Sequence, residues 1–84
     1  MTIADTIVCE IADAENAALT RAAAGGHGRA YTPRDVLMHA LGVLDGRLGS
    51  MRHIQLPPGD WARIFHAICR ASDTLREALE TEGD

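Results

Sequence analysis

The chain has 84 residues, of which 46% are hydrophobic and 24% are charged, and its formal net charge is −4. This length supports one domain with one modest core, and this apolar content excludes a disordered tail. No apolar run approaches the ~20 residues of a membrane span, and the first 24 residues carry four acids where a signal peptide needs an apolar stretch. We therefore expect a single cytoplasmic domain whose two cysteines, Cys9 and Cys69, are reduced.

The first element is a helix expected over residues 3–24. Thr2 followed by Asp5 predicts its start, because a threonine hydroxyl and an acid three residues later form a capping box. Gly25 and Gly26 predict its end. Its apolar residues repeat at helical spacing, bulky at the start and small at the end. This inner stripe is Ile3, Ile7, Ile11, Ala14, Ala18 and Ala22. The alanine end permits close approach by a neighbouring helix.

The second element is a helix expected over residues 33–52. Thr32 and Asp35 predict the same kind of cap, with Pro33 at the first helical position. Large apolar residues then recur four and three residues apart, which predicts a seam that faces the core. This seam is Leu37, Leu41, Leu44, Leu48 and Met51.

Three glycines, Gly42, Gly46 and Gly49, recur on the side of this helix opposite the leucine seam. An interior glycine costs about 1 kcal/mol relative to alanine, so the three together cost about 3 kcal/mol unless a close contact offsets them. Either the alanine end of the first helix packs against them within the monomer, or a second chain does so. We favour the second alternative and predict a partner or dimer interface that also includes Asp35 and His39.

The third element is a helix expected over residues 61–80. It follows the turn Pro57, Pro58 and Gly59, and we expect it to begin after Asp60. Its expected buried face is Trp61, Phe65, Ile68, Ser72, Leu75 and Leu79, with Ile64 beside it. Three amphipathic helices with short connections predict an all-α fold: one three-helix bundle-like domain over residues 1–84 that dimerises through helical faces.

No pattern of residues predicts catalysis or metal binding. His39 lies four residues after Asp35, and Cys69 lies three residues after His66, but a protein zinc site needs three or four ligands together. No serine or cysteine stands in a recognisable arrangement with a base and an orienting acid. We therefore expect a protein that is not an enzyme, with no metal site and no cofactor.

Charge is unevenly distributed along the chain. Residues 1–24 carry a net charge of −3, residues 25–56 of +2 and residues 57–84 of −3. The acidic ends suit a basic partner surface, and the acids expected to contact it are Asp13, Glu15, Glu77 and Glu80. Arginines offer an alternative, contact with nucleic-acid phosphates, through Arg47, Arg52, Arg63 and Arg70. Direct DNA or RNA binding is disfavoured, because no concentrated basic face and no recognition helix stand out.

These features predict a non-enzymatic protein interaction module, a small acidic inhibitor or regulator of a larger, nucleic-acid-binding complex. In size, acidity and helical character the chain is similar to many phage-encoded inhibitors of host systems, anti-CRISPR proteins among them, whose targets have basic grooves. This similarity lies in the overall profile, and no individual residue carries it. The alternative is a small dimeric DNA-associated regulator, of the antitoxin or repressor type, that uses the arginines.

Overall fold

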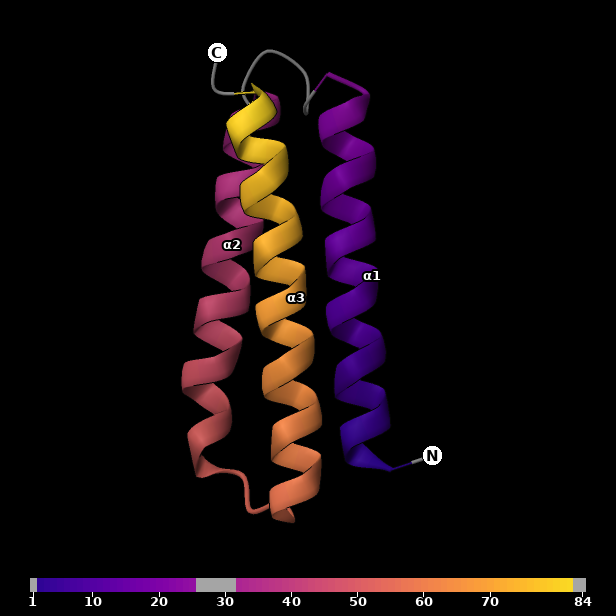
Figure 1. The fold of residues 1–84 in the computed structure, drawn as a ribbon, viewed down its shortest axis with the longest axis vertical. Helices are drawn as coiled ribbons and strands as arrows, with labels where there is room; N and C mark the ends of the chain where they lie inside the picture. Colours follow the sequence, from indigo (N-terminus) through magenta and orange to yellow (C-terminus); the bar gives the residue numbers. More distant parts are fainter. Residues whose placement is uncertain (1, 26–31, 83–84) are drawn as a thin grey trace.

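Three α-helices form the bundle. The computed structural model describes residues 2–25 and 32–82, within which α1 spans Ile3–Ala23, α2 spans Pro33–Ser50 and α3 spans Pro58–Glu82. A short 3₁₀ helix, η1 (Met51–His53), follows α2 directly. The helices alternate in direction along the chain, and each contacts the other two (Figure 1). The bundle measures 42 × 20 × 18 Å. For the described residues, the expected all-α architecture with three helices is confirmed.

Both predicted capping boxes are present. The Asp5 backbone N–H donates to Thr2 Oγ1 at 3.1 Å, and the Thr2 N–H donates to Asp5 Oδ2 at 3.2 Å. The same pair of bonds joins Asp35 and Thr32, at 3.2 and 3.1 Å. Each box satisfies two backbone N–H groups at a helix N-terminus, where helical hydrogen bonds are missing. The predicted starts of the first two helices are therefore confirmed.

Gly25 ends α1 as expected. Its φ of +96° lies in the left-handed region that favours glycine, and its N–H donates to the Ala22 carbonyl at 3.1 Å. Gly26, expected to share in this end, lies outside the described residues.

The start of α3 differs from the prediction. The helix begins at Pro58 rather than after Asp60, so the expected start is wrong. Proline suits the first helical position because it has no N–H to leave unpaired there. The carbonyl of Pro57 accepts the N–H groups of Asp60 and Trp61, at 3.0 and 3.1 Å. The second helix, expected to reach residue 52, runs as α2 through Gly49 only to Ser50 and then tightens into η1.

The predicted leucine seam of α2 faces the core. Leu37, Leu44 and Met51 are buried, and Leu41 and Leu48 are half-buried at its edge. Most of the predicted α1 stripe is also buried. The buried hydrophobic residues are Ala4, Ile7, Ile11, Ala18, Ala22, Val36, Leu37, Leu44, Met51, Ile64, Ile68, Ala71 and Leu75.

Two residues expected in the core are exposed instead. Ile3 is 62% exposed and Phe65 is 53% exposed, whereas their neighbours Ala4 and Ile64 are buried. Each helix of the bundle packs against two others. The buried part of its circumference, its buried arc, is therefore rotated away from the stripe that apolar spacing alone predicts. The buried arc of α3 runs through Ile64, and Phe65 lies about 100° farther around the helix.

Candidate interaction surface

The three glycines of α2 lie on the outer side of the bundle. A Cβ atom added to Gly42, Gly46 or Gly49 would meet nothing within 4 Å among the described residues outside the local backbone. The alternative in which the alanine end of α1 packs against these glycines is therefore wrong, because α1 contacts α2 on a different side. We refer to Gly42, Gly46 and Gly49 as the glycine face.

Two large apolar side chains border the glycine face. Met38 is 54% exposed and Val43 is 49% exposed. At 100° per residue they lie about 140° apart around α2, with the three glycines between them. The outer side of α2 therefore presents exposed apolar side chains beside bare backbone.

The remaining residues predicted for this interface differ in their roles. Asp35 is exposed, but its carboxylate accepts the Thr32 N–H and so caps α2. His39 is exposed on α2 and lines a recess between α1 and α2.

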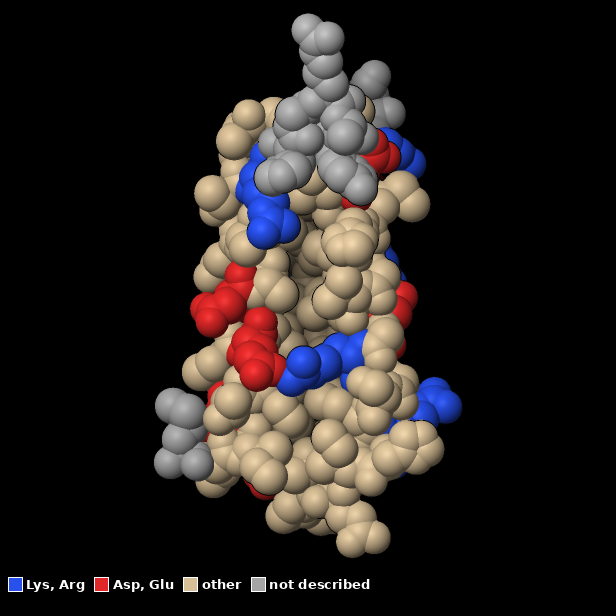
Figure 2. Space-filling model, turned by 180° about the vertical axis from the view of Figure 1, so that it is seen from behind, with Lys and Arg blue, Asp and Glu red and all other residues tan. Residues whose placement is uncertain are grey.

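This recess has a volume of about 510 Å³ and is visible as a hollow between the two helices (Figure 2). Four residues of each helix line it, spaced at i, i+3, i+4 and i+7, so each set occupies one helical face. The α1 residues are Ala14, Ala17, Ala18 and Arg21, and the α2 residues are Val36, His39, Ala40 and Val43. Six of the eight are alanine or valine, whose short side chains leave the space between the helices unfilled.

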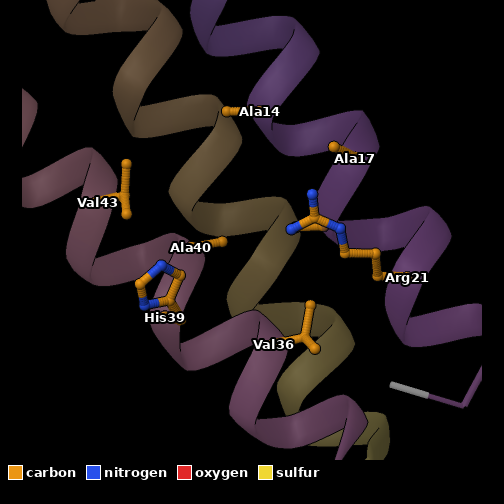
Figure 3. A pocket seen from close by; sticks show the side chains of 8 residues that line it. Ala14, Ala17, Arg21, Val36, His39, Ala40 and Val43 are labelled. Carbon is orange, nitrogen blue, oxygen red and sulfur yellow. The ribbon is translucent and has the colours of Figure 1, made fainter. Parts of the chain in front are cut away.

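Charged side chains mark the two ends of the recess. At one end Arg21 extends from α1 toward α2 (Figure 3), and it forms no ion pair within the described part of the chain. At the other end Arg47 of α2 forms an ion pair with Glu10 of α1. Glu10 lies one turn before Ala14, and Arg47 lies one turn after Val43, so this pair joins the two helices beyond the recess.

A second ion pair joins α1 to α3. Arg63 Nη2 donates to Asp5 Oδ1 at 2.7 Å. This hydrogen bond and, after it, the cap bonds with Thr2 together lower the pKa of Asp5 from 3.8 to about 2. The carboxylate in turn raises the pKa of Arg63.

The four arginines of the alternative nucleic-acid surface do not form one patch. Asp5 and Glu10 lie about 140° apart around α1, so their partners Arg63 and Arg47 approach α1 from different sides. Both arginines are also neutralised by these acids. Arg52 and Arg70 are exposed, and neither forms an ion pair within residues 2–25 and 32–82.

The predicted acidic contacts are likewise spread over the surface. Asp13, Glu77 and Glu80 are exposed, whereas Glu15 is half-buried. Asp13 and Glu15 lie about 160° apart around α1, so they do not share one face. Each of the four stays a prediction as a separate partner contact.

In the described ranges 2–25 and 32–82, no group of three His, Cys, Asp or Glu side chains is placed to share a metal ion. No helix in the same ranges combines the length and the apolarity needed to cross a membrane. Cys9 and Cys69 are both exposed free thiols.

The lining of the recess was not predicted from sequence. Ala17, Arg21, Ala40 and Val43 stood outside every predicted site. Small residues at helical spacing indicate such a recess only when it is known which side of α1 faces which side of α2.

Comparisons with protein-family models, curated proteins and solved structures find no match to this chain. The features of this chain that bear on its function are the glycine face and the recess. The two surfaces are continuous, because Val43 lines the recess and borders the glycine face.

Proposed function

We propose that the protein is a non-enzymatic interaction module, a small acidic inhibitor or regulator that binds a larger complex through the glycine face and the recess. The observation that carries this proposal is that no described residue packs against the three interior glycines. Gly42 and Gly46 lie in the interior of α2 and cost the helix about 2 kcal/mol, Gly49 near its end adds less, and they give the monomer no packing in return. A partner lying on α2 would offset this cost, because a missing Cβ lets its backbone approach closely.

The charge of the chain suits a basic partner. The formal net charge is −4, and Asp13, Glu77 and Glu80 are exposed. A net negative charge speeds association with a basic partner, although these acids are spread over the surface and do not surround the recess. Phage-encoded inhibitors of the anti-CRISPR type, which act in the cytoplasm on nucleic-acid-binding complexes, are an example of this class.

A DNA-associated regulator is the weaker alternative. It needs Arg47, Arg52, Arg63 and Arg70 to attract phosphate together, and two of these arginines are paired with acids on different sides of α1. A homodimer is compatible with the main proposal. In that case a second copy would occupy the glycine face, and sedimentation velocity of wild type and Gly46→Leu would detect it.

Photo-crosslinking tests the proposal directly. A photoreactive amino acid replaces Val43 on the proposed surface or, as the control, Arg70 on the exposed side of α3, and each tagged protein is irradiated in lysate of the native host. We expect position 43 to crosslink to one protein or complex that position 70 does not capture. Equal capture from both positions, or none from position 43, would contradict the proposal.

The captured component is then purified and tested for direct binding. Wild type is expected to bind it, and Gly46→Leu is expected to bind at least tenfold more weakly while keeping the helical circular dichroism of wild type. If the captured component is a DNA-binding protein that does not bind this chain directly, the result would favour the alternative of a DNA-associated regulator.

A further inference from the structure

We infer that the recess between α1 and α2 receives an amphipathic helix of the partner, which inserts an aliphatic side chain and places an acidic residue one turn away against Arg21. This inference rests on the proposed function and names the chemistry of the segment that the surface binds.

The shape of the recess favours a helix. Its lining residues repeat at i, i+3, i+4 and i+7 on both α1 and α2, so the two walls are helical faces about 10 Å long. A helix laid along such walls projects side chains into the space between them, as in other helix-in-groove complexes. The Glu10 and Arg47 pair closes one end, which limits the inserted part to about two turns.

The lining of the recess selects an aliphatic side chain. Ala14, Ala17, Ala18 and Ala40 form much of the surface, with Val36 and Val43 beside them. An inserted leucine or isoleucine would cover this apolar surface and lose its own contact with water. A buried anchor of this kind, within a well-packed centre, commonly supplies most of the affinity of an interface.

Charge specifies the second feature of the partner. Arg21 reaches over the recess (Figure 3), and no acid within residues 2–25 and 32–82 pairs with it. Arg47 at the far end is already neutralised by Glu10. Arg21 lies four residues beyond Ala17, about 6 Å along α1, which is close to one helical turn. A carboxylate one turn from the inserted side chain would therefore meet the guanidinium, which binds carboxylates through two parallel hydrogen bonds.

The test is a displayed library of helical peptides, selected in parallel on the wild-type protein and on Arg21→Glu. Peptides selected by the wild type should carry Asp or Glu one turn from an aliphatic residue, and those selected by Arg21→Glu should carry Lys or Arg there. Exchanging peptides between the two proteins should weaken binding about two- to fivefold, as expected for an exposed ion pair. No enriched peptide, or enrichment that ignores residue 21, would overturn the inference.

A matched pair of substitutions locates the binding. Ala17→Phe fills the recess and should weaken the selected peptides more than tenfold. Ala12→Phe makes the same change at an exposed alanine of α1 outside the recess and should leave binding unchanged. Val43→Lys changes an exposed position of the other wall and should also weaken peptide binding. This second variant keeps the test valid if Ala17→Phe does not fold. Equal effects at positions 12 and 17 would overturn the inference.

Other occupants are also outcomes of this test. Self-association of the wild type that Ala17→Phe abolishes would assign the recess to a second copy and overturn the inference. If decanoate binds, Ala17→Phe abolishes that binding and no peptide is selected, the recess would be assigned to a small amphiphile and the inference would be overturned. If position 43 captures a partner by photo-crosslinking but no helical peptide is selected, this inference fails and the proposed function stands.

Discussion

The inner and outer faces of α2 carry residues at the same helical spacing, yet they have opposite physical roles. Leu37 and Leu44 on the inner face are buried where α2 packs against α1 and α3, as is Met51 of η1 just beyond it. Gly42 and Gly46 on the outer face have no described side chain against them. Periodicity identifies both faces, but side-chain size separates them. The inner face stabilises the monomer, whereas the glycines of the outer face lower helix stability, and we propose that a bound partner offsets this cost.

The largest expected effect comes from the inner face. Leu37→Ala should lower the free energy of unfolding by about 2–5 kcal/mol, because Leu37 is fully buried and its loss leaves a cavity. Met38→Ala, at the adjacent exposed position, should change it by less than about 0.5 kcal/mol. Urea unfolding of both variants checks this, and similar losses at the two positions would break the comparison.

The next expected effect is a change in the free energy of unfolding that has opposite signs for the same Gly→Ala substitution at two glycines. Gly46→Ala should raise the free energy of unfolding by about 0.5–1 kcal/mol, because the new Cβ meets nothing and alanine favours the helix. Gly25→Ala makes the same change at a φ of +96° and should lower it by about 1–2 kcal/mol. Thermal and urea unfolding measure both. A destabilised Gly46→Ala would mean that the outer face packs against something within the monomer.

The cap of α2 stabilises the N-terminus of the helix that carries both faces. Thr32→Ala removes the hydroxyl that accepts the Asp35 N–H and should cost about 1 kcal/mol. Thr81→Ala removes a hydroxyl that bonds within the last turn of α3 and should cost less than about 0.5 kcal/mol. Urea unfolding compares the two. A larger loss for Thr81→Ala would argue against the capping box as a stabilising element.

The smallest effect depends on pH and concerns the contact between α1 and α3. The pKa of Asp5 is about 2 in the folded chain and 3.8 ordinarily, so its ionised form favours folding. This contribution is full above about pH 4 and is lost as pH falls toward 2. Asp5→Asn should therefore have a lower Tm than the wild type at pH 6, and the difference should vanish near pH 2. A difference that is constant with pH would exclude the ion pair with Arg63 as its source.

Features set by neighbouring residues could be predicted from the sequence. The capping boxes at Thr2 and Thr32 and the seam through Leu37 and Leu44 depend on spacings of three or four residues within one helix. Those predictions are confirmed by the hydrogen bonds and the burial.

Features that depend on how the helices face one another could not be predicted from the sequence. Phe65 fits an apolar stripe, but the contact of α3 with two neighbours rotates its buried arc toward Ile64. The recess around Ala17 and Arg21 exists only because these residues of α1 lie opposite Val36 and Val43 of α2. Spacing along one helix contains no information on that pairing.

Gly46→Leu tests the central claim most directly, through its unfolding free energy and its affinity for the photo-crosslinked partner, measured on the same preparation. We expect a cooperatively folded variant at least as stable as the wild type, because the space beside Gly46 is open in the monomer, and we expect partner binding to weaken at least tenfold. A variant that loses stability, or one that binds the partner as the wild type does, would contradict the central claim.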